Sequence, residues 1–201
     1  TKLQPDHGAT LTARATPGKI AVCVRATTRF KEVPVKLLLF LVVLGVVAFF
    51  APAPLGHAEQ SVEIATSRDK VWGVIGDLTS ARLWDPGMKE MKITSDTKVG
   101  PGTVRTAAGA LVKTTETVRD WAGYNKVTLD VIHDPNITKF ETSTLTIEPG
   151  TGGGTRVTWA LDYQMSGGYL GHFADKFLLG SVHLGRISEG LANLKRYAET
   201  G

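Results

Sequence analysis

Between Lys89 and Met165 hydrophobic and polar positions alternate along the chain, a period of two that is typical of strands with one buried face. Glycine, asparagine, aspartate and proline separate the alternating stretches, which predicts antiparallel strands joined by short turns. The predicted strands cover residues 62–64, 89–96, 101–108, 110–120, 125–133, 138–148 and 155–165.

A helical pattern follows the first of these strands. Thr66 and Asp69 have the spacing of a capping box, and apolar residues then recur three, four and seven positions after Val71. A second, shorter helical piece covers residues 80–84 and must end before Pro86. We therefore expect two short helices between the first strand and the second.

The helical period returns after Gly168 and continues to the end of the chain. One stripe of this predicted helix holds Tyr169, Phe173, Phe177, Gly180, Leu184, Ile187, Leu191 and Leu194. A helix of about 30 residues is ~45 Å long and can cross a whole sheet. The order of elements therefore predicts an α+β fold, in which a curved seven-stranded antiparallel sheet wraps around a long C-terminal helix.

A separate apolar segment precedes the strands, in the sequence KLLLFLVVLGVVAFFAPAPLGHAEQ. It is uncharged from Leu37 to Ala58, and prolines interrupt it after Phe50. We interpret residues 36–58 as a signal peptide cleaved after Ala58, with Ala51-Pro52-Ala53 as a poorer site. Retention as a transmembrane helix or membrane anchor, and burial as a core helix, are the alternatives.

Residues 1–35 show no sustained period, and we expect them to be unstructured or not part of the native protein. One hypothesis is that translation starts at Val35. The domain organisation is then a leader at 36–58 and one domain at 59–201, which predicts an exported protein, periplasmic or secreted, or one anchored to the membrane through residues 37–58.

This division changes what charge and cysteine content imply. The chain carries +4, but residues 1–58 hold seven of the 23 basic and two of the 19 acidic residues, which leaves −1 for residues 59–201. No basic stripe for nucleic acid remains in the domain, and we expect no nucleic-acid partner. The single cysteine, Cys23, also lies outside it, so a disulfide and a thiolate metal site are excluded there.

The domain resembles the START-like, or SRPBCC, superfamily, and within it the branch of polyketide cyclases, dehydrases and lipid-transport proteins. The matching stretches are RDKVWGVIGDLTSARLWDPGM, VGPGTVR, ETVRDW, GGGTRVTWALDY and the terminal helix. The resemblance covers about residues 61–198. It implies a helix-grip fold enclosing a cavity between sheet and terminal helix, which would hold a lipid, a polyketide or another apolar molecule.

Arg105 and Glu116 are the first candidate site residues. A turn near Ala108-Gly109 would place Arg105 opposite Val112, on the same face as Glu116. Because that face also carries Val118, it is expected to point inward, where the two charges would pair or orient a polar ligand group. The alternative is an exposed cross-strand pair.

Aromatic side chains are the other candidates for ligand contacts. Trp84 borders the cavity mouth by the resemblance and could cover a ligand, or it could be an ordinary core residue. The remaining candidates combine the last strand and the terminal helix: Trp159, Tyr163, Phe173 and Phe177. Such stripes are often plain core. A mid-helix Gly180 would be explained by room for a ligand or by a close strand.

Specific catalytic and metal motifs are absent from the sequence. His133, His172 and His183 have no spacing suited to metal ligands, and residues 150–155 (GTGGGT) fit a hairpin turn better than a phosphate loop. We therefore expect neither metal nor cofactor. An exported binder of an apolar small molecule or lipid is the preferred function, with a cyclase or dehydrase using acid-base groups, or an interaction module with a filled core, as alternatives. A cavity too small for a few heavy atoms would favour the last.

Overall fold

The computed structural model describes residues 34–109 and 112–201, with the side chains of residues 178 and 179 excepted. Nearly all of the stretch 1–35, and the first two residues of the predicted strand 110–120, lie outside these residues. The whole apolar segment is described, and so is everything from there to the C-terminus apart from the gap at 110–111.

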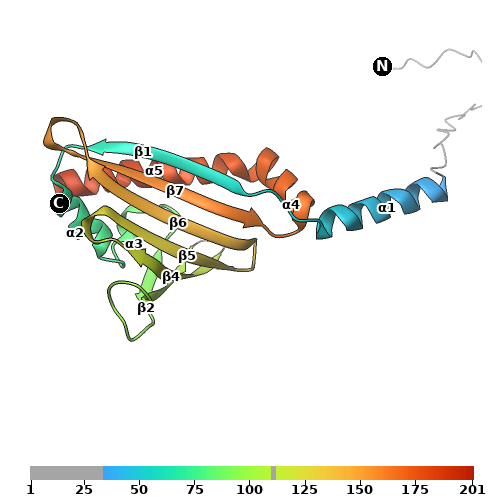
Figure 1. The fold of residues 1–201 in the computed structure, drawn as a ribbon, viewed down its shortest axis with the longest axis horizontal. Coiled ribbons are helices and arrows are strands. Elements are labelled where there is room, and N and C mark those ends of the chain that lie inside the picture. Colours follow the sequence, from blue (N-terminus) through green and yellow to red (C-terminus); the bar gives the residue numbers. More distant parts are fainter. Residues whose placement is uncertain (1–33, 110–111) are drawn as a thin grey trace, which may run out of the picture.

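Within the described residues, seven strands form one antiparallel sheet in the order β1-β7-β6-β5-β4-β3-β2 (Figure 1). The strands are β1 (Gly56–Ile64), β2 (Glu90–Ile93), β3 (Val104–Ala108), β4 (Lys113–Trp121), β5 (Lys126–Asp134), β6 (Thr138–Pro149) and β7 (Thr155–Met165). All strands after the first pair with their neighbours in sequence, as the short predicted turns require. The predicted sheet is confirmed.

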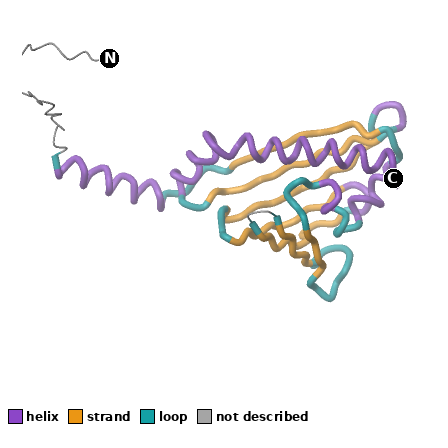
Figure 2. Tube along the Cα trace, turned by 180° about the vertical axis from the view of Figure 1, so that it is seen from behind, coloured by secondary structure: helices purple, strands orange, loops and turns teal. Residues whose placement is uncertain are grey.

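The helices also follow the prediction. They are α1 (Val35–Phe50), α2 (Arg68–Gly76), α3 (Ala81–Trp84), α4 (Gly168–Ala174) and α5 (Gly180–Thr200), with short 3-10 turns η1 (Gly123–Asn125) and η2 (Thr151–Gly153). A π-helical turn, η3 (Asp175–Leu179), joins α4 to α5. The C-terminal helix runs along the sheet beside β1 and β7, which gives the helix-grip architecture (Figure 2).

The hydrophobic core lies between the inner face of the sheet and α5. On β7 the inner side chains Val157, Trp159, Leu161 and Tyr163 are buried, and Ile187, Leu191 and Leu194 face the core from α5. Alternate residues of β7, such as Arg156 and Asp162, are exposed. The alternation in the sequence therefore reports the two faces of the sheet correctly.

Strand β1 is longer than predicted. The sequence pattern indicated residues 62–64, whereas the strand begins at Gly56 and pairs with β7 over its whole length. Its N-terminal half lacks the alternation of apolar and polar residues, because β1 is an edge strand and carries polar side chains there. Ala58, the residue before the expected cleavage point, is buried opposite Leu161. The strand thus begins inside the segment that we interpreted as a leader.

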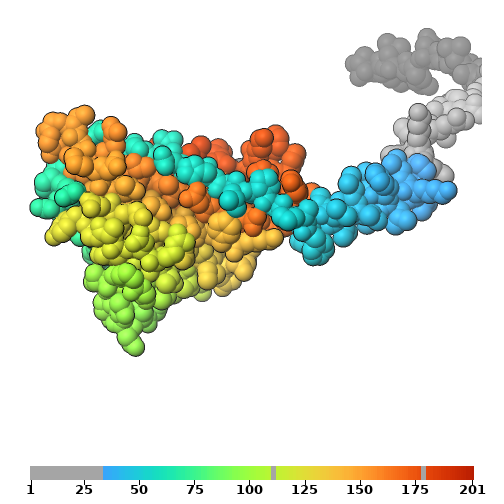
Figure 3. All heavy atoms as spheres, viewed as in Figure 1, coloured from blue at the N-terminus to red at the C-terminus, as the bar shows by residue number. Residues whose placement is uncertain are grey.

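Helix α1 stands away from the rest of the molecule (Figure 3). None of its residues is buried, so the interpretation of this segment as a core helix is wrong. No helix among the described residues is long and apolar enough to span a membrane. The C-terminal end of α1 contacts the turn at Gly167 and Gly168, where both glycines have positive φ and a side chain on Gly168 would collide with α1 carbonyl groups.

Candidate functional site

A row of buried polar side chains crosses the inner face of the sheet at one register. Arg105 of β3 pairs with Glu116 of β4, and the same row continues through Val131 of β5 to Glu141 and then Tyr163. His133 joins the row from β5, and Asp175 and His183 meet it from the helical side. We call the seven polar residues the polar band: Arg105, Glu116, His133, Glu141, Tyr163, Asp175 and His183.

The Arg105–Glu116 pair is fully internal. The two side chains have exposed fractions of only 8% and 5%, and Nε of Arg105 donates to Oε2 of Glu116 at 2.5 Å. A second guanidinium nitrogen donates to the Leu78 carbonyl oxygen in the loop after α2. The turn is centred later than expected, so that Arg105 lies opposite Glu116 and not Val112. An even shift of register preserves the face, and the side chain still points inward.

His133 and Glu141 form a second buried pair. The His133 Nε2 atom lies 2.7 Å from Oε2 of Glu141, within hydrogen-bond distance. The other ring nitrogen of His133 has no hydrogen-bond partner in the described part of the chain, and neither does the hydroxyl of Thr114, directly opposite on β4. A buried polar atom without a partner is costly, which marks this end of the band as a place where a further group could bind.

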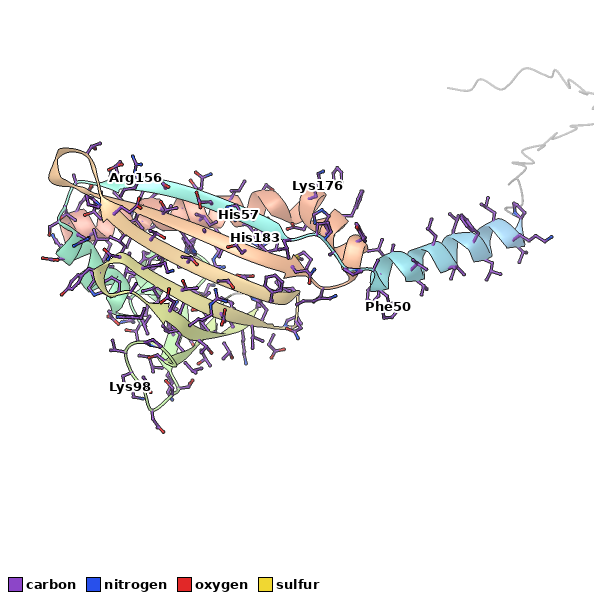
Figure 4. The ribbon with its side chains drawn as sticks, viewed as in Figure 1. Phe50, His57, Lys98, Arg156, Lys176 and His183 are labelled. Carbon is purple, nitrogen blue, oxygen red and sulfur yellow. The ribbon has the colours of Figure 1, made fainter. Side chains whose placement is uncertain are left out.

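Tyr163, Asp175 and His183 link the sheet to the helix. The phenol of Tyr163 donates to Oδ2 of Asp175 at 2.9 Å, and Nε2 of His183 lies 3.6 Å from the other carboxylate oxygen. Burial, followed by the adjacent Asp175, raises the pKa of Tyr163. Burial also lowers the pKa of His183, although neighbouring carboxylates oppose the shift. Both rings are therefore held in the neutral form near pH 7. Figure 4 labels His183 on α5.

The local backbone explains how these groups come together. Asp175 is the first residue of η3, and the wider π-helical turn places its carboxylate against Tyr163. Gly56 of β1 lies opposite Tyr163, and any side chain there would collide with the tyrosine ring. Position 56 must therefore be a glycine for the Tyr163 phenol to reach the helix.

Beside the band, Trp84 and Trp159 pack edge to face with ring centroids 5.5 Å apart. Arg186 of α5 lies over the Trp159 ring at 5.5 Å and binds the Asp85 carboxylate through two nitrogens, at 2.9 and 2.6 Å. Burial alone would lower the pKa of Arg186, but the Asp85 carboxylate outweighs it and the net shift is upward. Gly190 lets α5 approach, since a Cβ there would lie 2.6 Å from the Trp159 ring. The two tryptophans thus fill space that a ligand would need.

The cavity that remains between sheet and helix has a volume of about 10 Å³ and is bordered by Arg105, Glu116, Glu141, Trp159 and Arg186, among others. Such a space holds about one water molecule. Larger hollows of about 490 and 480 Å³ lie elsewhere, over the β2–β4 edge and over β5 and β6, and both are half open to solvent. In the described residues no group of three or more metal-ligating side chains converges.

Five of the seven residues singled out from the sequence lie together in the interior: Trp84, Arg105, Glu116, Trp159 and Tyr163. Phe173 and Phe177 do not, because their side chains are 62% and 64% exposed. The extra residue in the π-helical turn breaks the 3.6-residue stripe, so residues before the turn face a different side from Ile187 and Leu191. Gly180 is the first residue after that turn, within the helix and away from any strand.

The sequence did not point to Asp85, Arg186, Glu141 or Asp175, and His133 and His183 were considered there only as metal ligands. His133 and Glu141 continue the inward positions of their strands in steps of two, beyond Val131 and before Ser143, so strand phase could have found them. Nothing in the sequence signals the π-helical turn that brings Asp175 to Tyr163.

Solved structures with similar folds define the class. The XoxI protein of Bacillus cereus has 23% identity and a TM-score of 0.59, covering 71% of this chain and 94% of its own. Norcoclaurine synthase from Thalictrum flavum has 11% identity and a TM-score of 0.59, with 75% and 98% covered. The ZhuI aromatase/cyclase of a Streptomyces species has 15% identity and a TM-score of 0.59, with 73% and 94% covered. The fold is thus the α+β helix-grip fold.

The chain belongs to the family described as polyketide cyclase / dehydrase and lipid transport, whose model matches residues 56–199. The match begins at the first residue of β1 and ends one residue before the last of α5, so it covers the whole sheet and its helix. Members of this family are ligand-binding proteins or cyclases, and they generally bind hydrophobic small molecules. No protein of curated function matches the chain.

Proposed function

We propose that this protein binds one hydrophobic small molecule that carries a hydrogen-bond-donating group, in the space between the sheet and the C-terminal helix. The observation that supports this proposal is the polar band. A core that served stability alone would do as well or better with apolar residues at these positions, since buried ion pairs recover little more than their desolvation cost. Several buried polar atoms also have no hydrogen-bond partner among the described residues.

The composition of the band suggests the polar group of the ligand. The carboxylates of Glu116 and Asp85 are each paired with an arginine. Within the described residues, the side-chain partners of Glu141 and Asp175 are histidine and tyrosine. Burial disfavours protonation of His183. A hydroxyl or amino group would donate to these carboxylates, and the apolar part of the ligand would pack beside the tryptophans.

Binding requires the interior to open, because the present cavity has a volume of about 10 Å³. The segment α4–η3 is the part best suited to move, since its apolar residues Phe173 and Phe177 are exposed and add little to the core. Burial of ~300 Å² of apolar ligand surface would contribute ~7 kcal/mol before the cost of association and of opening is subtracted.

The test is solvent extraction of the full chain, purified without detergent, followed by mass spectrometry of the extract. We expect one dominant hydrophobic species in wild type. In His133→Leu/Glu141→Leu the band loses its polar pair at little or no cost in stability, and the extract should lose that species. Extracts that are empty for both chains, or equally loaded, would contradict a ligand held by the band.

An interaction module with a filled core is the second candidate, and the volume of about 10 Å³ favours it. It predicts that no small molecule is taken up even from excess and that the chain binds another protein through its surface. Uptake of a hydrophobic species from excess, detected as added mass by native mass spectrometry, separates the two.

An enzyme of the cyclase or dehydrase type is the third candidate. The Tyr163–Asp175–His183 cluster supports it, because it places a phenol, a carboxylate and a neutral imidazole in contact. Two of the similar folds are named as a synthase and an aromatase/cyclase. Turnover that is lost in Tyr163→Phe, Arg105→Ala or Glu116→Ala while ligand uptake persists would favour this candidate over a pure binder.

We further infer that the protein is exported, with the apolar segment up to Ala58 acting as its signal. N-terminal sequencing of the native protein tests this, with Glu59 as the expected first residue. A mature chain beginning near Thr1 would overturn it. Cleavage there would remove three of the nine residues of β1, all at its N-terminal end.

A further inference from the structure

Exposed apolar side chains occur on two segments that meet at one end of the sheet, the β5–β6 hairpin, with Phe140 on the solvent face, and α4–η3 on the helical side. We call six of them the end patch: Ile137, Phe140, Tyr169, Leu170, Phe173 and Phe177. Their exposed fractions run from 38% to 64%. The Phe173 and Phe177 rings contact each other, with centroids 4.4 Å apart, and have no place in the core.

Backbone contacts hold the three segments of this end together. The amide of Ser166, just before α4, donates to the Ile137 carbonyl oxygen at 3.0 Å, which ties the β5–β6 hairpin to the start of α4. The Gln164 side chain donates to the Ala53 carbonyl oxygen, and α1 ends against Gly167 and Gly168. Figures 1 and 3 show α1 leaving the molecule at this end.

Helix α1 indicates what covers the patch. Its residues are apolar on every side, with Lys36 as the only charge, and none of them is buried. A helix that is hydrophobic all round is stable inside a protein core or in lipid. It is 16 residues long, about 24 Å, which is short of the ~30 Å hydrocarbon core of a bilayer.

We propose that the end patch is a docking face for a phospholipid membrane surface. In the chain that retains α1, before or without cleavage after Ala58, α1 lies in lipid and the contacts at Gly167, Gly168 and Gln164 bring this end of the domain to the same surface. Aromatic and aliphatic side chains there would enter the interface, and the exposed Lys139 and Lys176, which precede Phe140 and Phe177 in the chain, would meet lipid phosphates. Figure 4 labels Lys176 on η3, next to Phe177 in the chain.

The docking face lies over the part of the fold that opens in the proposed binding mechanism. Phe173 and Phe177 flank Asp175, whose carboxylate closes the polar band. Immersion of α4–η3 in lipid would favour its displacement from the sheet and would bring a hydrophobic ligand directly from the membrane. The docking itself does not depend on ligand binding, and the two can fail separately.

The test places an environment-sensitive nitrobenzoxadiazole label on single cysteines of the full chain, with Cys23→Ser as the background. Labels replace Phe140 or Phe177 in the patch, and Val99 or Tyr124 away from it, where Val99 follows the labelled Lys98 of Figure 4. The vesicles contain phosphatidylcholine with or without phosphatidylglycerol. We expect blue-shifted emission for the two patch labels only, and a stronger response with the anionic lipid.

In Phe173→Ser/Phe177→Ser, the lipid concentration needed to shift the emission of the label at Phe140 should rise about tenfold. The reason is that two phenyl groups are no longer transferred from water into lipid. Val99→Ser is the matched control and should change nothing. The proposal is overturned if the chain floats with vesicles while both patch labels stay in water, because α1 alone then binds. The proposal is also overturned if light scattering shows that the chain is a dimer in the absence of lipid and that the double substitution makes it a monomer.

Discussion

At the scale of single residues, the most informative feature is that one buried and one exposed ion pair occupy neighbouring strands. Arg105–Glu116 joins β3 to β4 in the interior, and Arg119–Asp130 joins β4 to β5 on the solvent side at 3.0 Å. Two arginine–carboxylate pairs in one sheet therefore differ in their exposure to solvent. The cost of breaking each pair should depend on its burial and not on its geometry.

Glu116→Ala should lower the free energy of unfolding by about 3 to 5 kcal/mol, because it leaves the Arg105 guanidinium buried without a counter-charge. Asp130→Ala should cost under about 1 kcal/mol. Urea denaturation, monitored by tryptophan fluorescence, measures both. Arg105→Met/Glu116→Leu should recover most of the loss. Equal effects of the two alanine variants would show that the inner pair is not buried in solution.

His183 predicts a pH dependence of stability. Its pKa is lowered in the folded state by burial, so the unfolded chain binds more protons between the folded value and about 6.5. The contribution of neutral His183 is fully present above about pH 6.5 and is lost as the pH falls through the folded pKa. His183→Gln should therefore show a shallower decline in unfolding free energy between pH 7 and pH 5. Parallel curves for the two chains would contradict the burial of this imidazole.

At the scale of elements, the C-terminal helix shows how one glycine serves packing while another does not. Gly190 faces Trp159, where a Cβ would lie 2.6 Å from the ring, whereas nothing lies within 4 Å of a Cβ at Gly185. Gly190→Ala should destabilise the protein by roughly 1 to 3 kcal/mol through overpacking. Gly185→Ala should stabilise it by about 0.5 to 1 kcal/mol. Thermal unfolding of the two variants measures the difference, and a stabilising Gly190→Ala would mean that α5 does not contact the sheet this closely.

The elements also show what a sequence pattern can and cannot predict. Alternation in β5 and β7 gave the buried faces, because burial on one side of a sheet imposes a period of two. The same periodic reasoning failed at Phe173 and Phe177, because a π-helical turn changes the phase of a helix without a residue signature. It also missed the first six of the nine residues of β1, where an edge strand carries polar side chains on both faces.

The candidate site was predictable only in part for a related reason. Arg105, Glu116 and Tyr163 could be found as polar residues on apolar strand faces, and the register that unites them with Glu141 follows from the order of the sheet. Their helical partners come from long-range packing that local pattern does not encode. The small volume of the cavity could not be predicted from the sequence either, since it depends on how Trp84 and Trp159 pack in the interior.

At the scale of the whole molecule, the fold and the family indicate ligand binding, whereas the interior has almost no free volume. The helix-grip fold and the family are those of proteins that bind hydrophobic small molecules. The interior holds a charged row and room for about one water molecule. These observations agree if the empty state is closed and a ligand enters by displacing α4 and η3, close to the end patch.

Native mass spectrometry of the gently purified full chain tests this account most directly. We expect a species heavier than the bare chain by the mass of one small hydrophobic molecule, and we expect this species to be lost in His133→Leu/Glu141→Leu at unchanged stability. A wild-type chain that shows only its own mass, and that takes up nothing from a lipid extract in excess, would contradict the account and leave the filled-core interaction module as the better description.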